Sequence, residues 1–460
     1  MKSHFPAILF SAFFLFLQIS CSVTGEVELV EEETPVLPEP SPGELDLSFN
    51  GIGYVTRNNT AGTTGDDLAK GVITDRNNNI YATGTSYDGT SAFMTLWKCK
   101  EDGTPDASFG DNGVVVSRIQ GGSEYSQEGG EDLVTDSQGN ILVIGYFSAI
   151  SGNTTSKAYI WKYTPGGALM TTFGNNGILV IDLGDRDERF EDIELDAHDN
   201  IFIVGSYNNK AAILKFDSRG VFCQDFGVNG VSTGFRTGVK FVALAIAPGG
   251  AIYCTGYDYL GYDSTDDMLL MKFNSDGTVD TSFGSSGYVT HDNAVACSFS
   301  GDDRGECITL DDSENIYIGG YSGYWYSKYF SVWKCTSDGS LDTSFGQKGF
   351  VSLYRPPSIR GASYANDITL DSSNYILLTG LAHDMTYDDM IIWKFLPDGT
   401  LDPRFGTDGM VTHDNAAQKT SDFTHDFGQA IHLDNKGRII VAGSSWGDTG
   451  IDMAIWRYIN

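Results

Sequence analysis

Positive charge is scarce in this chain of 460 residues. It has 29 lysines and arginines against 61 aspartates and glutamates, which gives a formal net charge of −32. A surface this acidic repels phosphate backbones and anionic lipid headgroups, so nucleic acid is not expected as a partner. Many of the acids stand in turn sequences such as residues 75–79 (DRNNN), where Asp and Asn have a local backbone role. The charge therefore indicates a hydrated surface.

The local motifs of common enzyme classes are also missing. The sequence has no G-x-x-x-x-G-K-[ST] phosphate loop, no H-E-x-x-H zinc motif and no D-x-D-x-D-G calcium loop. One G-x-S-x-G match occurs at residues 443–447, but a short polar loop follows it instead of the helix that a nucleophile elbow requires. We therefore predict no catalytic residue and no cofactor, and leave bound calcium open.

Long apolar runs are confined to residues 6–17, a stretch too short to span a membrane. It is typical of a signal peptide, which we place at residues 1–20 and keep out of the fold. Cys21 follows the sequence LQIS, which looks like a bacterial lipoprotein cleavage site, so we expect lipid on Cys21. Gln18 departs from the aliphatic residue usual at its position, and ordinary secretion is the alternative.

Residues 21–44 contain no aromatic residue and are rich in Glu and Pro, so they cannot build a core. We expect a lipidated cysteine and an acidic, extended tether that holds a folded domain away from a membrane surface. Ser22 stands where enteric bacteria use an aspartate to retain lipoproteins in the inner membrane. The sequence therefore favours an outer-membrane lipoprotein of the bacterial cell envelope, which contacts the membrane only through its lipid.

One motif recurs throughout the rest of the chain. The sequence F-G-x-x-G, written F-N-G in its first copy, returns at intervals of about 60 residues. Its phenylalanines, called anchors below, are Phe49, Phe109, Phe173, Phe226, Phe283, Phe345 and Phe405. A period this long indicates arrayed supersecondary units that cannot bury their apolar faces alone.

The copy that begins at Phe345 shows what each unit encodes. Four short strands are predicted, at residues 349–353, 367–371, 375–380 and 390–395. Turns rich in Gly, Asn and Asp separate them, and no stretch has helical periodicity. Four short strands per unit are typical of one blade of a β-propeller.

Two polar positions repeat with the anchor. Five anchors carry an aspartate three residues earlier, and Met170 and Cys223 replace it in the other two. The third strand of each unit ends in a basic residue: Lys98, Lys162, Lys215, Lys272, Lys334, Lys394 and Arg457. We interpret this pattern as an Asp–Lys pair and a wedged Phe that lock neighbouring units, because a catalytic group is rarely needed so many times.

The two ends of the repeat region are complementary. An anchor strand at residues 53–56 has no unit before it, and the last copy ends on a third strand within residues 452–458. Pairing the two removes an exposed sheet edge. We therefore predict an all-β domain over residues 45–460, a monomeric seven-bladed β-propeller of four-stranded antiparallel blades, closed by pairing the N-terminal strand with the C-terminal blade.

These motifs resemble the delta-60 repeat family of bacterial envelope and secreted proteins, which is regarded as a propeller repeat. The resemblance covers residues 44–460 and rests on the pattern D-x-x-F-G-x-x-G, which the third and fourth copies match least because they lack the Asp. It implies a fold and no established activity, so it carries over no catalytic residue.

Cysteine is rare, with seven in the chain. Cys297 and Cys307 lie in one loop and the strand that it enters, and a disulfide between them suits an oxidising compartment. Two unpaired thiols are the alternative. Cys99 and Cys335 occupy one strand position of non-adjacent units, so they are not expected to pair with each other.

Loop length separates two faces of the domain. Strand direction alternates within a blade, so the short turns share one face and the long loops share the other, where binding residues usually gather. Exposed Tyr and Trp combine contact area with a polar tip, which suits a glycan or a protein surface. The candidate ligand-binding residues are Tyr257, Tyr259, Tyr262, Tyr324, Trp325 and Tyr326. Packing of these side chains onto blade edges is the alternative.

A second group on the same face contains imidazoles and a carboxylate. Neutral imidazole together with carboxylate can hold a divalent metal, and the candidates are His383, Asp384, His413 and His425. However, residues 291–293 repeat the HDN sequence of residues 413–415, which favours a repeat-derived loop cap.

Three functions fit the sequence. The leading interpretation is a lipid-anchored envelope propeller that binds a protein or glycan through its long-loop face. The alternative is a hydrolase or lyase that acts on an extracellular polysaccharide or peptide with acids of the same face, and the third is a structural surface protein. A cleft with close carboxylates would favour an enzyme, and an aromatic surface would favour a binder.

Overall fold

The computed structural model describes residues 40–62, 65–119, 126–149, 156–184, 188–208, 210–233, 238–259, 265–292, 294, 301–324, 327–353, 361–383, 387–420 and 423–460. These residues form 28 β-strands and no α-helix. Within them, no helix is long and apolar enough to cross a membrane. Residues 40–460 make up one compact unit, which confirms the all-β class predicted from the repeat.

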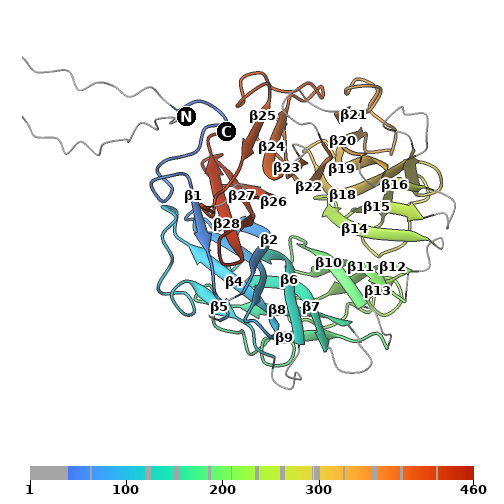
Figure 1. Ribbon diagram of the computed structural model, residues 1–460. Coiled ribbons are helices and arrows are strands. Elements are labelled where there is room, and N and C mark those ends of the chain that lie inside the picture. Colours follow the sequence, from blue (N-terminus) through green and yellow to red (C-terminus); the bar gives the residue numbers. More distant parts are fainter. Residues whose placement is uncertain are drawn as a thin grey trace, which may run out of the picture. The chain divides into compact units, whose positions relative to one another are not determined.

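The strands form four-stranded antiparallel meanders (Figure 1), called sets here. In sheet order from the inner to the outer strand, the sets are β2 (Asp67–Thr74), β3 (Ile80–Tyr87), β4 (Ala92–Cys99) and β5 (Val114–Val116); β6 (Ser126–Thr135), β7 (Ile141–Ala149), β8 (Ser156–Tyr163) and β9 (Ile178–Ile181); β10 (Glu188–Leu195), β11 (Ile201–Tyr207), β12 (Lys210–Phe216) and β13 (Val231–Ser232); β14 (Val239–Ile246), β15 (Ile252–Tyr259), β16 (Asp266–Phe273) and β17 (Tyr288–His291); β18 (Asp302–Leu310), β19 (Ile316–Tyr324), β20 (Ser327–Cys335) and β21 (Phe350–Leu353); β22 (Ser363–Leu370), β23 (Ile376–His383), β24 (Asp388–Phe395) and β25 (Met410–His413); and β26 (Asp426–Leu433), β27 (Ile439–Trp446), β28 (Ile451–Tyr458) and β1 (Tyr54–Arg57). The first two sets are joined into one eight-stranded sheet by a single parallel bridge between Ala92 and Gln127.

Neighbouring sets pack through their faces. The second and third strands of a set are nearly continuous apolar runs, and β23 and β24 are buried at most positions because another set covers each side. Each inner strand contacts the inner strands of the sets before and after it, and β26 of the last set contacts β2 of the first. The ends of the chain's repeat region therefore lie side by side, with β26–β28 (red) beside β2–β4 (blue) in Figure 1.

Every inner strand carries a β-bulge at the same position. The register against the second strand shifts by one residue, and the extra residues are Lys70, Glu131, Glu191, Val242, Glu306, Asn366 and Gln429. A bulge increases the local twist of a strand, which lets strands that converge at the centre of the molecule splay toward its rim. The sequence pattern alone did not reveal this feature.

The predicted pair between the anchor aspartate and the basic residue is present in four of the sets. The distances between the basic nitrogen and the carboxylate oxygen are 2.9 Å for Lys98–Asp106, 3.7 Å for Lys272–Asp280, 3.0 Å for Lys334–Asp342 and 2.8 Å for Arg457–Asp46. A hydrogen bond from Ser108 and then the ammonium of Lys98 lower the pKa of Asp106 to about 2.

Two other sets depart from this pairing. The third anchor has Met170 in place of the aspartate, and Lys162 binds Asp136 of the neighbouring turn instead, at 2.9 Å. In the set of β24, Lys394 is 3.8 Å from Asp371, while the anchor residue Asp402 is engaged by Arg404 at 3.0 Å. The basic residue therefore finds a carboxylate in both cases, because a buried ammonium without a partner is costly.

Each anchor is a wedge against the next set. The anchor phenylalanines are 0–1% exposed. The backbone N–H after the anchor donates to a carbonyl of the next set's tight turn, as Gly346 does to Asp398 at 2.8 Å. In that turn Gly399 has a φ of +84°, and a Cβ there would lie 2.9 Å from the ring of Phe345. Only glycine satisfies both conditions, which explains why this turn position holds Gly103, Gly167, Gly220, Gly277, Gly339 and Gly399.

The N-terminal residues complete the last set. Strand β1 pairs antiparallel with β28, with Tyr54 opposite Trp456, which is the pairing that the sequence predicted. Residues 40–44, assigned to the tether by sequence, also belong to this junction: Gly43 donates to the Ile459 carbonyl of the last set at 2.8 Å, and Gly406 of the set before it donates to the Pro42 carbonyl at 3.0 Å. This repeats the backbone contact that the other anchors make.

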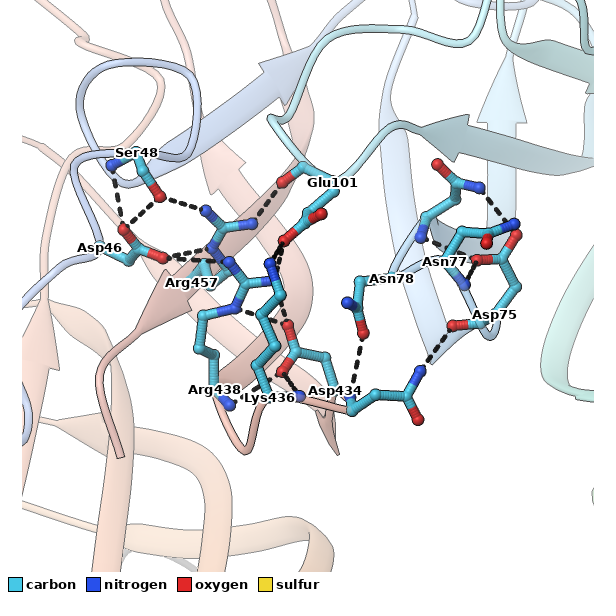
Figure 2. Close-up of polar contacts among 12 residues, drawn as sticks. Asp46, Ser48, Asp75, Asn77, Asn78, Glu101, Asp434, Lys436, Arg438 and Arg457 are labelled. Atoms are coloured by element: carbon cyan, nitrogen blue, oxygen red, sulfur yellow. Dashed lines mark hydrogen bonds and ion pairs between the residues drawn. The ribbon is translucent and has the colours of Figure 1, made fainter.

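Figure 2 shows the polar contacts at this junction, called the seam here. The Arg457 guanidinium, 1% exposed, bonds to Asp46, to the Ser48 hydroxyl at 2.8 Å and to the Glu101 carbonyl. Arg438 also bonds to the Glu101 carboxylate, at 2.8 Å. Segments from both ends of the chain thus share one buried ion network with the first set.

Carboxylates beside the bulges link the inner strands. Asp192 accepts a hydrogen bond from the Leu244 backbone N–H at 2.6 Å, and Asp367 accepts one from Ile431 at 2.7 Å. Burial raises the pKa of Asp367 to about 7, and burial and the nearby Asp192 raise that of Glu194 to about 8. The folded protein therefore holds protons here that the unfolded chain releases near pH 4.

The seam should contribute strongly to stability. Replacing Asp46 by Ala leaves the buried Arg457 guanidinium without its carboxylate, and we expect the free energy of unfolding to fall by about 3 kcal/mol or more. Urea denaturation followed by circular dichroism measures the change. Asp182→Ala is the matched control, because the Asp182 side chain is 54% exposed in its pair with Lys157 and should give no measurable change. Equal effects of the two variants would contradict a structural role for the seam.

Stability should also depend on pH through the inner carboxylates. Because their folded-state pKa values lie above their unfolded values, stability is highest below the unfolded pKa and decreases as pH rises toward about 8. We expect the melting temperature in calorimetry to decrease between about pH 5.5 and about pH 8.5. Glu194→Gln should flatten this dependence, whereas Asp312→Asn in an exposed turn should leave it unchanged. A melting temperature that rises over this range would contradict the assignment.

Candidate functional site

The two faces of the unit differ in their connections. Turns between inner and second strands are closed by short hydrogen bonds, such as that from the Asp75 N–H to the Asn79 carbonyl at 2.9 Å. Because adjacent strands are antiparallel, the opposite face carries the loops from each outer strand to the next inner strand and from each second strand to the third. This is the long-loop face predicted from the sequence.

Buried acids fix the long loops. Five inner strands carry, within their first three residues, a carboxylate with 0–1% exposure: Asp67, Glu128, Glu188, Asp303 and Asp426. Each accepts a backbone N–H from the loop that precedes it, as Asp67 does from Thr60 at 3.1 Å and Asp426 does from Ala416 at 3.1 Å. Burial raises the pKa of Glu128 to about 7. These acids hold loops in place and are closed to a substrate, so they do not serve the hydrolase alternative.

The predicted tyrosine group is divided by the structure. The Tyr257 ring is half-buried under the Arg304 guanidinium, whose carbon lies 4.0 Å from the ring centroid, and Arg304 also bonds to Asp266 at 2.6 Å. Tyr259 is 42% exposed at the end of β15. Tyr262, Trp325, Tyr326 and the side chain of Tyr324 lie outside the described residues. Tyr257 therefore belongs to a packed cluster, and Tyr259 is the member open to a ligand.

The predicted histidine group is held by carboxylates. Asp388 lies between two imidazoles, 2.9 Å from Nδ1 of His383 and 3.1 Å from Nδ1 of His425. His413 instead bonds to Asp426 at 3.0 Å and packs against Trp456. Asp388 was missed by the sequence analysis, because it becomes a neighbour only when β23, β24 and β26 assemble.

The position of His413 recurs elsewhere in the fold. His291 ends β17 as His413 ends β25, and its Nδ1 accepts a hydrogen bond from the Trp333 indole at 3.2 Å. This agrees with the repeat-derived loop cap. Among the described residues, no three His, Cys, Asp or Glu side chains are grouped to hold a metal ion, and Asp384 lies outside them. A metal at this group stays a prediction.

An exposed aromatic surface adjoins His425, and the sequence analysis missed it. We call Tyr387, Phe423, His425 and Trp446 the aromatic patch. Phe423 is 66% exposed and Trp446 37% exposed, while the His425 ring lies 4.4 Å from Trp446 and 5.8 Å from Tyr387, centroid to centroid. The Lys419 ammonium lies 5.3 Å from the Trp446 ring centroid. The patch offers flat apolar faces bordered by a positive charge.

Two long loops are fastened together beside the patch. The Thr420 N–H and hydroxyl both bond to the Asp448 carboxylate, at 3.0 Å and 2.9 Å. Residue 446 could have been found from the repeat, because the position three residues after the glycine of the second strand holds Tyr87, Tyr259, His383 and Trp446 in four of the copies. Phe423 and Tyr387 have no such signal.

The cysteines of the described part are thiols. No two of Cys99, Cys223, Cys254, Cys307 and Cys335 pair with each other, and burial raises the pKa of Cys99 to about 11. The predicted disulfide partner of Cys307, Cys297, lies outside the described residues. Their pairing is therefore left as a prediction.

Two hollows lie beside the first set. One, of about 500 Å³, adjoins the seam on the short-turn face and is lined by Ser48, Asn77, Asn79, Lys100, Glu101, Asp102, Arg438 and Arg457. The other, of about 530 Å³, lies between the outer strands β1 and β5 and is lined by Arg57, Asn58, Asn59, Thr60, Asp111, Asn112, Val114, Val116 and Arg118. Among the lining residues, the first hollow has the adjacent acids Glu101 and Asp102 and the second has Asp111 alone, so neither brings together acids from two different elements.

Comparison with known families agrees with the architecture. Residues 250–283 match a family described as "Domain of unknown function (DUF5122) beta-propeller". No curated protein matches the chain. The fold is a β-propeller built of repeated four-stranded sets, and the matched family is a propeller family without an assigned activity.

Several solved structures are similar in fold. A protein of unknown function from Dyadobacter fermentans is 11% identical, with a TM-score of 0.42, over 89% of this chain and 98% of that one. The polysaccharide lyase Uly1 is 10% identical, with a TM-score of 0.46, over 88% and 92%. Sqt1 of Chaetomium thermophilum is 11% identical, with a TM-score of 0.46, over 88% and 98%. Likenesses this distant carry no argument about function.

Proposed function

We propose that the chain is a seven-bladed β-propeller that acts as a binding or scaffold module for a protein or glycan through its long-loop face. Seven blades are supported by the strand sets, by the same bulge in each inner strand and by the contact of β26 with β2. The completion of the last set by β1 supports closure through the N-terminal strand.

The observation that carries the binding role is the aromatic patch. Monomeric proteins rarely leave large aromatic side chains in contiguous exposed groups without a use. Phe423 and Trp446 are exposed, and near them Thr420 is bonded to Asp448 and Ala416 to the buried Asp426, so a ligand would meet side chains whose neighbours are already held in place. Aromatic faces beside a lysine and imidazoles suit sugar rings and the centre of a protein interface alike.

The proposed setting is the bacterial cell envelope. A lipid on Cys21 and a tether over residues 21–44 would present the propeller away from an outer-membrane surface, and a secreted form is the alternative. Residues 1–39 lie outside the described residues. The net charge of −32 disfavours nucleic acid, and we propose a monomer whose membrane contact is the lipid alone.

Replacing Trp446 by Ala should weaken ligand binding about tenfold or more, because a central aromatic contact of an interface typically contributes at least that much. Glycan and surface-protein arrays probed with the full chain would identify the ligand, and titration of that ligand would measure the change. The control is Tyr87→Ala, which removes a ring of similar exposure, 38%, from another set. Unchanged binding by the Trp446 variant, or equal loss in both variants, would contradict the patch as the site.

Replacing Cys21 by Ser should move the protein from the membrane fraction to the soluble envelope fraction, because the lipid is the proposed anchor. Cell fractionation followed by immunoblotting measures this. Cys223→Ser, which changes a thiol of the propeller, is the control and should remain with the membranes. A wild-type protein that already fractionates as soluble would rule out the anchor.

A further inference from the structure

The hollow between β1 and β5 differs in charge from the rest of the molecule. Arg57 and Arg118 both line it, together with the amides of Asn58, Asn59 and Asn112. Within the described part of the chain, neither guanidinium lies within ion-pair distance of a carboxylate. Asp111 is the one carboxylate among the described lining residues, and Arg118 also acts at longer range on the buried Glu128. The two arginines therefore give the lining a net positive charge, in a chain whose acids outnumber its basic residues by 61 to 29.

Each arginine donates a hydrogen bond across the hollow to a backbone carbonyl on its opposite side. Arg57, on the β1 side, donates from Nη2 to the Asn112 carbonyl on the β5 side at 3.3 Å. Arg118, on the β5 side, donates from Nη2 to the Ala61 carbonyl on the β1 side at 3.1 Å, and its guanidinium lies 4.4 Å from the Phe93 ring centroid. Each guanidinium has five N–H donors, so these single bonds orient the group and leave further donors for a ligand.

The architecture does not require these arginines. Structural positions in this chain recur from copy to copy, as the anchors and their basic partners do. At the position of Arg57 the other copies have Ser117, Ile181, Gly234, His291, Leu353 and His413. At the position of Arg118 they have Asn58, Asp182, Phe235, Asp292, Tyr354 and Asp414. Both arginines are therefore particular to this junction, and a role in the shared fold does not account for them.

We propose that this hollow binds the anionic group of an acidic polysaccharide, a carboxylate or a sulfate ester, with Arg57 and Arg118 as the charged donors. Guanidinium forks match the planar oxygen pairs of such groups. Asn58, Asn59 and Thr60 line the same wall and can exchange hydrogen bonds with sugar hydroxyls. A volume of about 530 Å³ is within the usual range for a small-ligand site.

The overall negative charge does not prevent this. At physiological ionic strength the screening length is about 8 Å, so distant acids are largely screened while groups lining the hollow act directly. The inference deepens the proposed function by naming the class of glycan, and it rests on that function only in so far as the ligand is a glycan. Its residues are separate from the aromatic patch.

Isothermal titration of the full chain, purified in detergent, tests the site with four polymers. Polygalacturonate supplies carboxylates and dextran sulfate supplies sulfate esters, unmodified dextran is the neutral reference, and poly-L-glutamate represents an acidic peptide. We expect at least one acidic polysaccharide to bind and neutral dextran not to bind. The affinity for the acidic polysaccharide that binds should fall about tenfold or more in Arg57→Gln and in Arg118→Gln.

Two further variants make the test specific. Arg219→Gln removes the same charge from an arginine 74% exposed in its pair with Asp217, and it should leave binding unchanged. Arg57→Lys keeps the charge but loses the fork, and it should bind with intermediate affinity. Among the described residues, Arg57 has no aromatic ring under its guanidinium, whereas Arg118 lies over Phe93, so the Arg57 variants test the site even where Arg118→Gln loosens that packing; melting curves check that each variant is folded.

The outcomes separate this site from the aromatic patch. The proposal is overturned if neither acidic polysaccharide binds, if both Gln variants bind normally, or if Arg219→Gln weakens binding as much. Poly-L-glutamate that binds as tightly and depends on Arg57 would overturn it in favour of an acidic protein. If Trp446→Ala loses binding to the array ligand while Arg57→Gln binds normally, the anion-site proposal is overturned and the proposed function is retained.

Discussion

The contact on which the architecture depends is the wedge between one anchor phenylalanine and the tight turn of the next set. It combines a fully buried ring, a backbone hydrogen bond and a turn glycine whose φ no other residue adopts easily. A four-stranded set cannot cover its own apolar faces, so packing against the neighbouring sets stabilises it, and this contact is part of that packing. The basic residue at the end of the third strand adds charge to the same corner.

The stability of such an array depends on how its first and last sets are joined. An open array would leave one set without a wedge and one sheet edge unpaired, which invites association with other chains. Here the N-terminal residues supply both missing parts: Pro42 accepts the bond that a turn carbonyl accepts elsewhere, and β1 covers β28. The seam uses Arg457 where the other sets use lysine, and its planar fork reaches Asp46, Ser48 and the Glu101 carbonyl together.

Because the short-turn face carries these contacts, the long-loop face is free to vary. Buried carboxylates near the start of the inner strands accept backbone N–H groups from the described parts of its loops, such as those of Thr60 and Ala416. Departures from the repeat then mark what one blade adds to the shared frame. Phe423 on one side, and Arg57 and Arg118 on the other, are such departures, and each proposed site contains at least one of them.

The sequence by itself determined the strand sets, the anchors, most of the Asp–basic pairs and the pairing of the two ends. Each of these depends on residues whose spacing repeats, such as Phe345 and Lys334, and a repeated environment leaves a repeated pattern. The candidate sites were only partly accessible in this way. Tyr259 and the histidines were found because their residue types are conspicuous, whereas Asp388 and Phe423 were not.

Only the tertiary structure decided which side chains meet. It placed Asp388 between His383 and His425, packed Tyr257 under Arg304, and set Arg57 across a hollow from Arg118. Most of these pairs come from different sets, and His383 faces Asp388 across one hairpin; their distances follow from bulges, twist and the packing of neighbouring sets. The sequence shows the spacing of the repeat, but the direction of a side chain between two sets depends on how both sets pack against each other.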